Sequence, residues 1–357
     1  MPLVNFSNLD FNQIKTSLRD YLRANSDFTD YDYEGSNLSS IIDLLAYNTY
    51  INSYNANMVT NEVFIDSATL RENVVSLAKN IGYTPRPRRA AKALVSFAVD
   101  VGDTTAVAVT LKKGIVATTS ATFGGSNYTF SIPEDITVGV DDTGLALFDS
   151  ITVYEGVYIQ QEFSVNSRTP NQKYILTNSG IDTNLIRVNV KDSANSTIVR
   201  KFTQSKGLFD VKSDSPVYYL QEVENERYEI LFGDGIFGLP VQEPNVVQVG
   251  YIVSNGENGN NLSRLSYAGQ LVNNNGASIT TNITTMVVDQ QSYGGAQIES
   301  VDSIKKYAPQ IYASQNRAVT TVDYEAMIPK IYPEAESVSA FGGEELTPPK
   351  YGRVMVA

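Results

Sequence analysis

Cysteine, histidine and tryptophan are all missing from the 357 residues of this chain. Without cysteine there is no thiol nucleophile, disulfide or thiolate metal site. Without histidine there is no imidazole base and no ordinary zinc ligand near neutral pH. We therefore expect no catalytic residues, no metal site and no bound cofactor, although carboxylate, lysine, tyrosine and serine chemistry stay open.

Positive charge is also scarce, with 27 lysines and arginines against 39 acidic residues and a net charge of -12. A nucleic-acid binder needs a positive field, so no nucleic-acid partner is expected. No basic N-terminus precedes an apolar run and no segment approaches a membrane span, so we expect a cytoplasmic chain with no membrane partner. Between Lys113 and Arg168 there is no basic residue at all, which fits a solvated acidic surface or a face for a basic partner.

Residues 1–90 carry apolar side chains at helical spacing, and Ser36 is placed to cap one of the helices. On one side of the helix after Ser36 lie Leu38, Ile41, Ile42 and Leu45. Helices with such broad apolar faces could form a small bundle by themselves or a surface completed by another chain. The amphipathic pattern does not separate these two possibilities.

From residue 91 to residue 292 the pattern changes to β-branched and aromatic residues punctuated by Gly, Asn, Asp and Pro. It predicts an antiparallel β-rich region that could contain a module inserted around 103–215. Helical spacing returns in 293–357 and is followed by strand-like segments, which predicts the beginning of an α+β domain. We expect this last domain to continue beyond Ala357 or to be completed by a partner, because a half-built sheet leaves unpaired backbone groups. The predicted class is therefore α+β multidomain.

Three short motifs stand out in the chain. The Gly233, Asp234 and Gly235 run between two β-rich segments predicts a tight structural turn, because it lacks the spaced ligands of a calcium loop. A second cluster, Gly256–Asn261, predicts a loop. The arginines Arg86, Arg88 and Arg89 form the one concentrated basic patch, and we expect them to contact an acidic surface of a partner or of the neighbouring domain.

Three sequence blocks, in order along nearly the whole chain, carry a family resemblance. They include Asp32–Asn48, Asn61–Arg71 and Gly82–Arg86, then Phe232–Pro240 with Gly256–Asn260, then Gly294-Gly295, Phe341–Gly343 and Pro348–Gly352. With these blocks the chain resembles the baseplate J-like family of contractile tails, and most closely the wedge subunits of T-even-like myoviruses.

The resemblance implies a structural protein, not an enzyme, that lies in the baseplate of a virion tail and is assembled in the cytoplasm of a bacterial host. It implies that the N-terminal helices join a second baseplate wedge protein. It also implies that the C-terminal domain meets another copy of the chain, next to other baseplate and sheath-proximal subunits, in an inner ring that rearranges on sheath contraction. As interface residues we name Leu38, Ile41, Ile42, Leu45, Arg86, Arg88 and Arg89. The alternatives are a tail adhesin or glycan depolymerase, or a baseplate subunit of a phage-derived bacterial injection machine.

Overall fold

The computed structural model describes residues 10–24, 31–102, 107–119, 127–169, 172–205, 207, 211–315, 317–332 and 337–357. Its contacts divide the chain into two compact units. Unit 1 combines Met1–Pro85 with Ser300–Ala357, and unit 2 is Arg86–Glu299. These division points lie close to the expected boundaries at residues 90 and 293, but the first and last expected segments fall in one unit.

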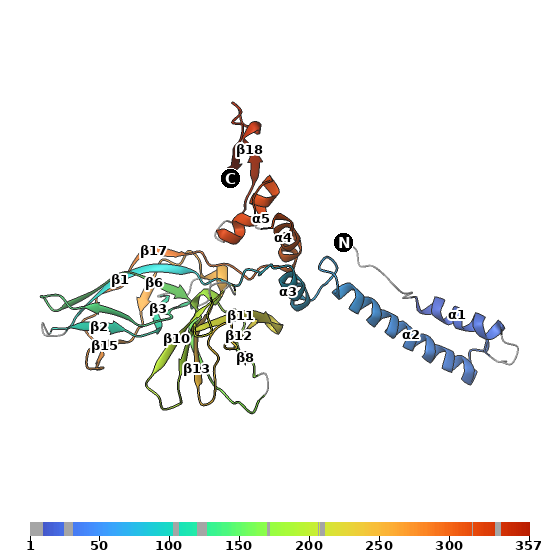
Figure 1. The fold of residues 1–357 in the computed structure, drawn as a ribbon, viewed down its shortest axis with the longest axis horizontal. Coiled ribbons are helices and arrows are strands. Elements are labelled where there is room, and N and C mark those ends of the chain that lie inside the picture. The colour runs from blue at the N-terminus through green and yellow to red at the C-terminus, as the bar shows by residue number, and fades with distance from the viewer. Residues whose placement is uncertain are drawn as a thin grey trace. The chain divides into compact units, whose positions relative to one another are not determined.

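Unit 1 is helical, with a small sheet near its end (Figure 1). Its elements are α1 (Phe11–Ala24), α2 (Asn37–Glu62), α3 (Arg71–Asn80), α4 (Val301–Ser314), α5 (Thr321–Ile331), β18 (Ala340–Gly342) and β19 (Val354–Val356). A shared core joins α3 to the C-terminal helices, because Val74 and Ala78 of α3 cluster with Ile304 and Ala308 of α4. The third N-terminal helix thus packs on segments that follow it by more than two hundred residues.

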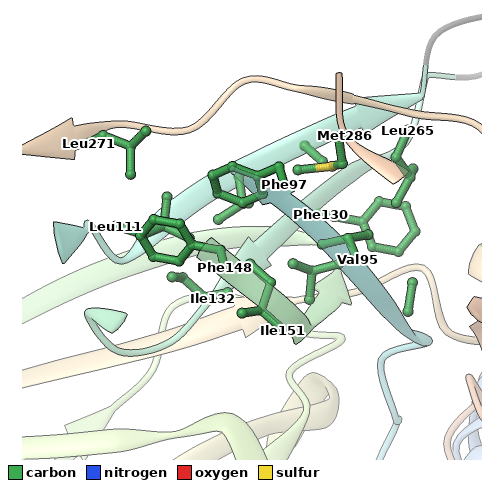
Figure 2. Packing of buried hydrophobic residues seen from close by; sticks show 14 of the residues in the cluster. Val95, Phe97, Leu111, Phe130, Ile132, Phe148, Ile151, Leu265, Leu271 and Met286 are labelled. Atoms are coloured by element: carbon green, nitrogen blue, oxygen red, sulfur yellow. The ribbon is translucent and has the colours of Figure 1, made fainter. Parts of the chain in front are cut away.

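One module of unit 2 is a pair of sheets around one core, and we call it the two-sheet part. The larger sheet has the order β14-β3-β4-β6-β1-β17, and the smaller has the order β16-β15-β2-β5. Figure 2 shows the core between them, where the rings of Phe97 and Phe148 stack with their centroids 4.8 Å apart. The strands are β1 (Lys92–Asp100), β2 (Ala108–Leu111), β3 (Gly114–Thr119), β4 (Thr129–Ile132), β5 (Ile136–Gly139), β6 (Leu145–Glu155), β14 (Leu265–Tyr267), β15 (Leu271–Asn273), β16 (Ser278–Ile279) and β17 (Val287–Tyr293).

A second core lies in a sheet of order β7-β13-β9-β10-β11-β12-β8. The strands are β7 (Val157–Ser164), β8 (Tyr174–Ile175), β9 (Arg187–Lys191), β10 (Val199–Gln204), β11 (Val217–Val223), β12 (Arg227–Phe232) and β13 (Val246–Val253). Its two edge strands approach each other, since Gln161 of β7 donates to the carbonyl of Ile175 in β8 at 3.4 Å. The sheet is therefore curled like a barrel around its apolar side chains.

This barrel module is inserted into the two-sheet part of unit 2. The chain enters it at Val157 and leaves it at Val253, and these two residues are paired in the ladder. Gly156 makes the entry with φ +126°, and a Cβ there would lie 2.3 Å from the carbonyl oxygen of Val253. The inserted range thus differs from the expected 103–215, whose first residues lie outside the described part of the chain, because a strand pattern does not say which strands pair.

The predicted α+β class is confirmed: N-terminal helices precede antiparallel β-rich modules, and a short helix and strand region follows. One pair departs from the antiparallel pattern, since β10 and β11 run parallel.

Candidate functional site: an uncharged helical face

The long helix α2 begins where the sequence predicts a cap. The Ser36 side chain accepts a hydrogen bond from the backbone N–H of Ser39 at 3.0 Å, which satisfies one of the free donors of the first turn. The helix then continues without a break to Glu62, over 26 residues. With no proline or glycine inside it, nothing in its sequence interrupts the backbone hydrogen bonds.

One side of α2 packs against α1, which lies alongside it (Figure 1). Buried Ser39, Ile42 and Ala46 follow one stripe of α2 at helical spacing. Two polar contacts hold the same helix pair: Arg19 donates to the Ser39 hydroxyl at 3.5 Å, and the Lys15 ammonium lies 2.5 Å from Asp43. This side of α2 is thus already occupied within the chain.

The opposite side of α2 is exposed although it is rich in large apolar residues. Its exposed apolar side chains, with Val63 and Phe64 just after the helix, are Ile41, Leu44, Leu45, Tyr47, Tyr54, Met58, Val59, Val63 and Phe64. Leu44 and Val59 are each 67% exposed. We call the exposed apolar residues of Ile41–Val59 the α2 face. Large exposed apolar patches mark protein–protein or membrane interaction sites, or ligand-binding grooves.

The α2 face also lacks charge. Residues 44–61 contain no Asp, Glu, Lys or Arg, and asparagine supplies much of their polarity. A helix side that stays in water normally carries charged residues. Uncharged amides among apolar side chains are instead compatible with a helical interface, in which each amide can find a partner. The composition of this surface therefore favours burial against another helix.

The end of α2 is joined to the start of α3 by Glu62. Its carboxylate accepts hydrogen bonds from Thr69 N–H at 2.8 Å, from the Thr69 hydroxyl at 2.6 Å and from the Asn73 amide at 2.8 Å. Burial acts to raise the pKa of Glu62, but these hydrogen bonds outweigh it and lower the pKa to about 2. Glu62 thereby ties the end of α2 to the segment that leads into α3, whose N-cap residue, Leu70, makes no side-chain cap hydrogen bond.

The four apolar residues named from the sequence fall on different sides of α2. Ile42 is only 2% exposed and belongs to the α1 side, and Leu38 is half-buried. Ile41 and Leu45 lie on the α2 face, at 52% and 49% exposure. The spacing argument missed Leu44, Tyr47 and Val59, and the uncharged run over 44–61 was the signal that could have found them.

The three arginines of the basic patch contact their own unit. The Arg86 guanidinium lies 3.9 Å from the Glu299 carboxylate. Arg88 donates to the carbonyl of Ser254 at 3.2 Å and lies 3.9 Å from Glu226. The backbone of Arg89 is bridged to Ala296. Contact of these arginines with another chain stays a prediction.

The Gly-Asp-Gly run lies in the connection between β12 and β13. The Asp234 carboxylate accepts from the backbone N–H groups of Ile236 and Phe237, both at 2.9 Å, and these bonds lower the pKa of Asp234. Gly235 has φ +89°, a conformation that glycine adopts without strain. The Asp234 carboxylate is thus hydrogen-bonded to the backbone of its own turn, as in an Asx turn.

In the part of the chain with assigned structure, no helix is both long and apolar enough to cross a bilayer. Across the same residues, no three acidic side chains come together as metal ligands would.

Two family models match this chain at its two helical regions. Residues 10–83 match the helical domain of gp6-like baseplate wedge proteins. Residues 320–357 match C-terminal domain I of the baseplate structural protein gp6. The first match covers α1, α2 and α3, so it includes the whole α2 face. The broader baseplate J-like resemblance stays a prediction, because both matched models are of the gp6 type.

A similar protein is the baseplate wedge protein gp6 of Enterobacteria phage T4, 27% identical over 335 residues. The similarity covers 89% of this chain and 49% of the relative, so the chain spans about half the length of the curated relative it matches. Among solved structures, the anti-feeding prophage baseplate is matched over 91% of this chain and 57% of the other, at 12% identity and a TM-score of 0.32. The chain is thus similar to gp6-like baseplate wedge proteins in its N-terminal helices and its last residues, and to the T4 wedge protein along most of its length.

Proposed function

We propose that the protein is a structural part of a baseplate wedge, and that its α2 face packs against helices of a second wedge protein. The observation that carries the proposal is an exposed apolar and uncharged helix side within the region that matches a gp6-like helical domain. The role is structural, not catalytic. It fits a chain without histidine or cysteine, the side chains most used in nucleophilic and general acid–base catalysis.

Burial of the α2 face would supply the free energy of assembly. Fully burying one Leu, Ile, Val or Met side chain stabilises a complex by roughly 1.5–3 kcal/mol before the costs of association are subtracted. Several such residues in one stripe are enough for a stable helical interface. The partner surface we propose is an apolar, weakly charged helix pair, since charged side chains would be desolvated opposite residues 44–61.

The finer parts of the role are proposed from the family resemblance of the sequence. We propose that another copy of this chain and further baseplate subunits complete the assembly in the tail baseplate of a virion. We propose also that assembly takes place in the host cytoplasm before the tail is complete. The inner ring that rearranges on sheath contraction belongs to this proposal as well.

Co-expression with candidate wedge proteins from the same genome, followed by native mass spectrometry, tests the interface. The double substitution Ile41→Ser and Leu45→Ser should weaken the complex at least about a hundredfold, because two apolar side chains leave the buried surface. These residues are half exposed in the isolated chain, so the variant should stay folded.

The matched control is Ile198→Ser, which removes a side chain that is 64% exposed in unit 2. It should leave the complex unchanged. If the double variant is folded and still assembles at the original affinity, the α2 face is not the interface. A self-trimer that cleaves polysaccharide would instead support the adhesin or depolymerase alternative.

A further inference from the structure

The chain crosses between its two units twice, after Pro85 and after Glu299, and within unit 2 the two crossing segments are paired. We call residues 86–91 and 294–299 the paired connector. The N–H of Arg89 donates to Ala296 at 2.9 Å, and the N–H of Ala296 donates back to Arg89 at 3.1 Å. Glu299 N–H also donates to the Arg86 carbonyl at 3.1 Å. The two crossings are thus one short antiparallel ladder and not independent linkers.

The end of this ladder next to the crossing points is closed by the Glu299 side chain. Its carboxylate is 1% exposed and accepts a hydrogen bond from the backbone N–H of Arg86 at 2.9 Å. The Arg86 guanidinium lies 3.9 Å away and supplies a compensating charge. A buried carboxylate is costly unless donors and a counter-charge meet it, so this geometry opposes separation of the two segments.

The other end of the paired connector is attached to both modules of unit 2. The N–H of Ala90 donates to the buried carboxylate of Asp182, in the barrel module, at 2.9 Å. The carbonyl of Ala91 accepts from Glu155 N–H at 2.7 Å, and Glu155 ends β6 of the two-sheet part. One strand of the connector therefore contacts both modules within two consecutive residues.

The Glu155 side chain extends this attachment to the loop that follows the barrel. It is completely buried, and its carboxylate accepts from the Ser254 hydroxyl at 2.7 Å, from Asn255 N–H at 3.0 Å and from the Asn255 amide at 2.8 Å. Three donors thus meet the two oxygens of this buried carboxylate. The carboxylate thereby fixes the start of the Gly256–Asn261 loop.

That glycine and asparagine loop holds the second strand of the paired connector. Asn260 accepts from Gly295 N–H at 2.8 Å and donates to the Gly295 carbonyl at 2.9 Å. Gln297 donates to the carbonyl of Asn255 at 3.0 Å. A Cβ at Gly295 would lie 2.4 Å from the Gly256 carbonyl oxygen, so only glycine allows this approach.

We propose that the paired connector is a single locked element, closed by Glu299 and anchored by Glu155 and Asp182, whose two strands open together. Force or motion that reaches unit 2 through one crossing is shared by the other, because the hydrogen bonds between the strands must break as a group. The inference rests on contacts within unit 2 and does not depend on the proposed baseplate role.

Hydrogen–deuterium exchange on the full chain tests the lock. Glu299→Ala removes the acceptor of the Arg86 N–H and should accelerate exchange about tenfold or more at the amides of Arg86, Arg89 and Ala296 together. Core amides of β1 and β13 should keep their protection. Glu299→Gln keeps an acceptor oxygen and removes the charge, so it should accelerate exchange at the same amides by a smaller factor. If the alanine variant does not fold, exchange in this glutamine variant tests the proposal.

Glu257→Ala is the matched control, since Glu257 is an exposed glutamate in the Gly256–Asn261 loop. It should leave exchange unchanged in both strands. The proposal is overturned if the folded Glu299 variants accelerate exchange at Ala296 while Arg89 stays protected, or if they change neither strand.

Discussion

Several single carboxylates in this chain accept hydrogen bonds from backbone N–H groups. Glu62, Glu155 and Asp234 each accept at least one main-chain hydrogen bond, and none of these bonds needs a histidine or a lysine. A carboxylate that accepts such bonds is favoured in its charged form. A chain with few basic residues thus organises its turns and helix ends with acidic side chains.

Glu62→Gln should destabilise unit 1 by about 1 kcal/mol at pH 7, the usual net contribution of a hydrogen bond that is lost or weakened. The pKa of Glu62 is lowered to about 2, so its contribution is fully present above the ordinary value of 4.5 and is lost as pH falls towards 2. Urea unfolding at pH 7 and pH 2 measures this. The difference between wild type and variant should shrink at pH 2, and an equal difference at both values would contradict the assignment.

Gly233→Ala should destabilise unit 2 by roughly 1–3 kcal/mol, the range typical of overpacking. A Cβ at this position would lie 2.2 Å from the backbone of Gly238, which cannot move without breaking the turn. Thermal unfolding followed by circular dichroism is the measurement. Gly139→Ala is the control, because its nearest neighbour would be the Val107 carbonyl at 3.9 Å, and it should unfold near the wild-type temperature.

At the scale of elements, helix starts could be predicted better than helix partners. Ser36 caps α2 as its sequence indicates, and Ser300 at the start of α4 accepts from Ser303 N–H at 3.2 Å. Thr320 and Asp323 form a reciprocal capping box at the start of α5. These signals are local, so a single sequence contains them.

The sides of α2 were harder to predict, since apolar residues are spread among polar ones nearly all round the helix. Spacing alone grouped Ile42 with Ile41 and Leu45, but α1 buries the first and leaves the other two exposed. Only the position of α1 decides this difference. The double substitution of Ile41 and Leu45 therefore tests a surface that the structure, not the pattern, separated from the helix pair.

At the scale of the whole molecule, contacts distant in sequence connect the modules. Glu134, between β4 and β5, lies 3.2 Å from Arg187 of β9 and also pairs with Lys201 of β10. Glu134 belongs to the window without basic residues, so part of that acidic surface meets basic side chains of the same chain. Residues 120–126 of the window lie outside the described part.

Glu134→Gln should lower the stability of unit 2 by less than about 1 kcal/mol, because the carboxylate is partly exposed and screened. Hydrogen bonds from Lys201 and Arg187 hold the pKa of Glu134 below its ordinary value, so the loss should appear above that value and fade in acid. Denaturant unfolding of wild type and variant, at low salt and at about 1 M salt, measures this loss of stability. A salt-independent loss would mean that the ion pairs are not its cause.

The sequence by itself determined the α+β class, the order of helical and β-rich regions, the caps and the turn chemistry, because each depends on neighbouring residues. The tertiary structure alone decided that α3 packs on α4, that residues 157–253 form an inserted barrel module, and that the Glu299 carboxylate accepts from the Arg86 N–H. The missing cysteine and histidine exclude thiol and imidazole chemistry without any structure. Which apolar side chains stay exposed for a partner depends on long-range packing, and no local pattern contains that information.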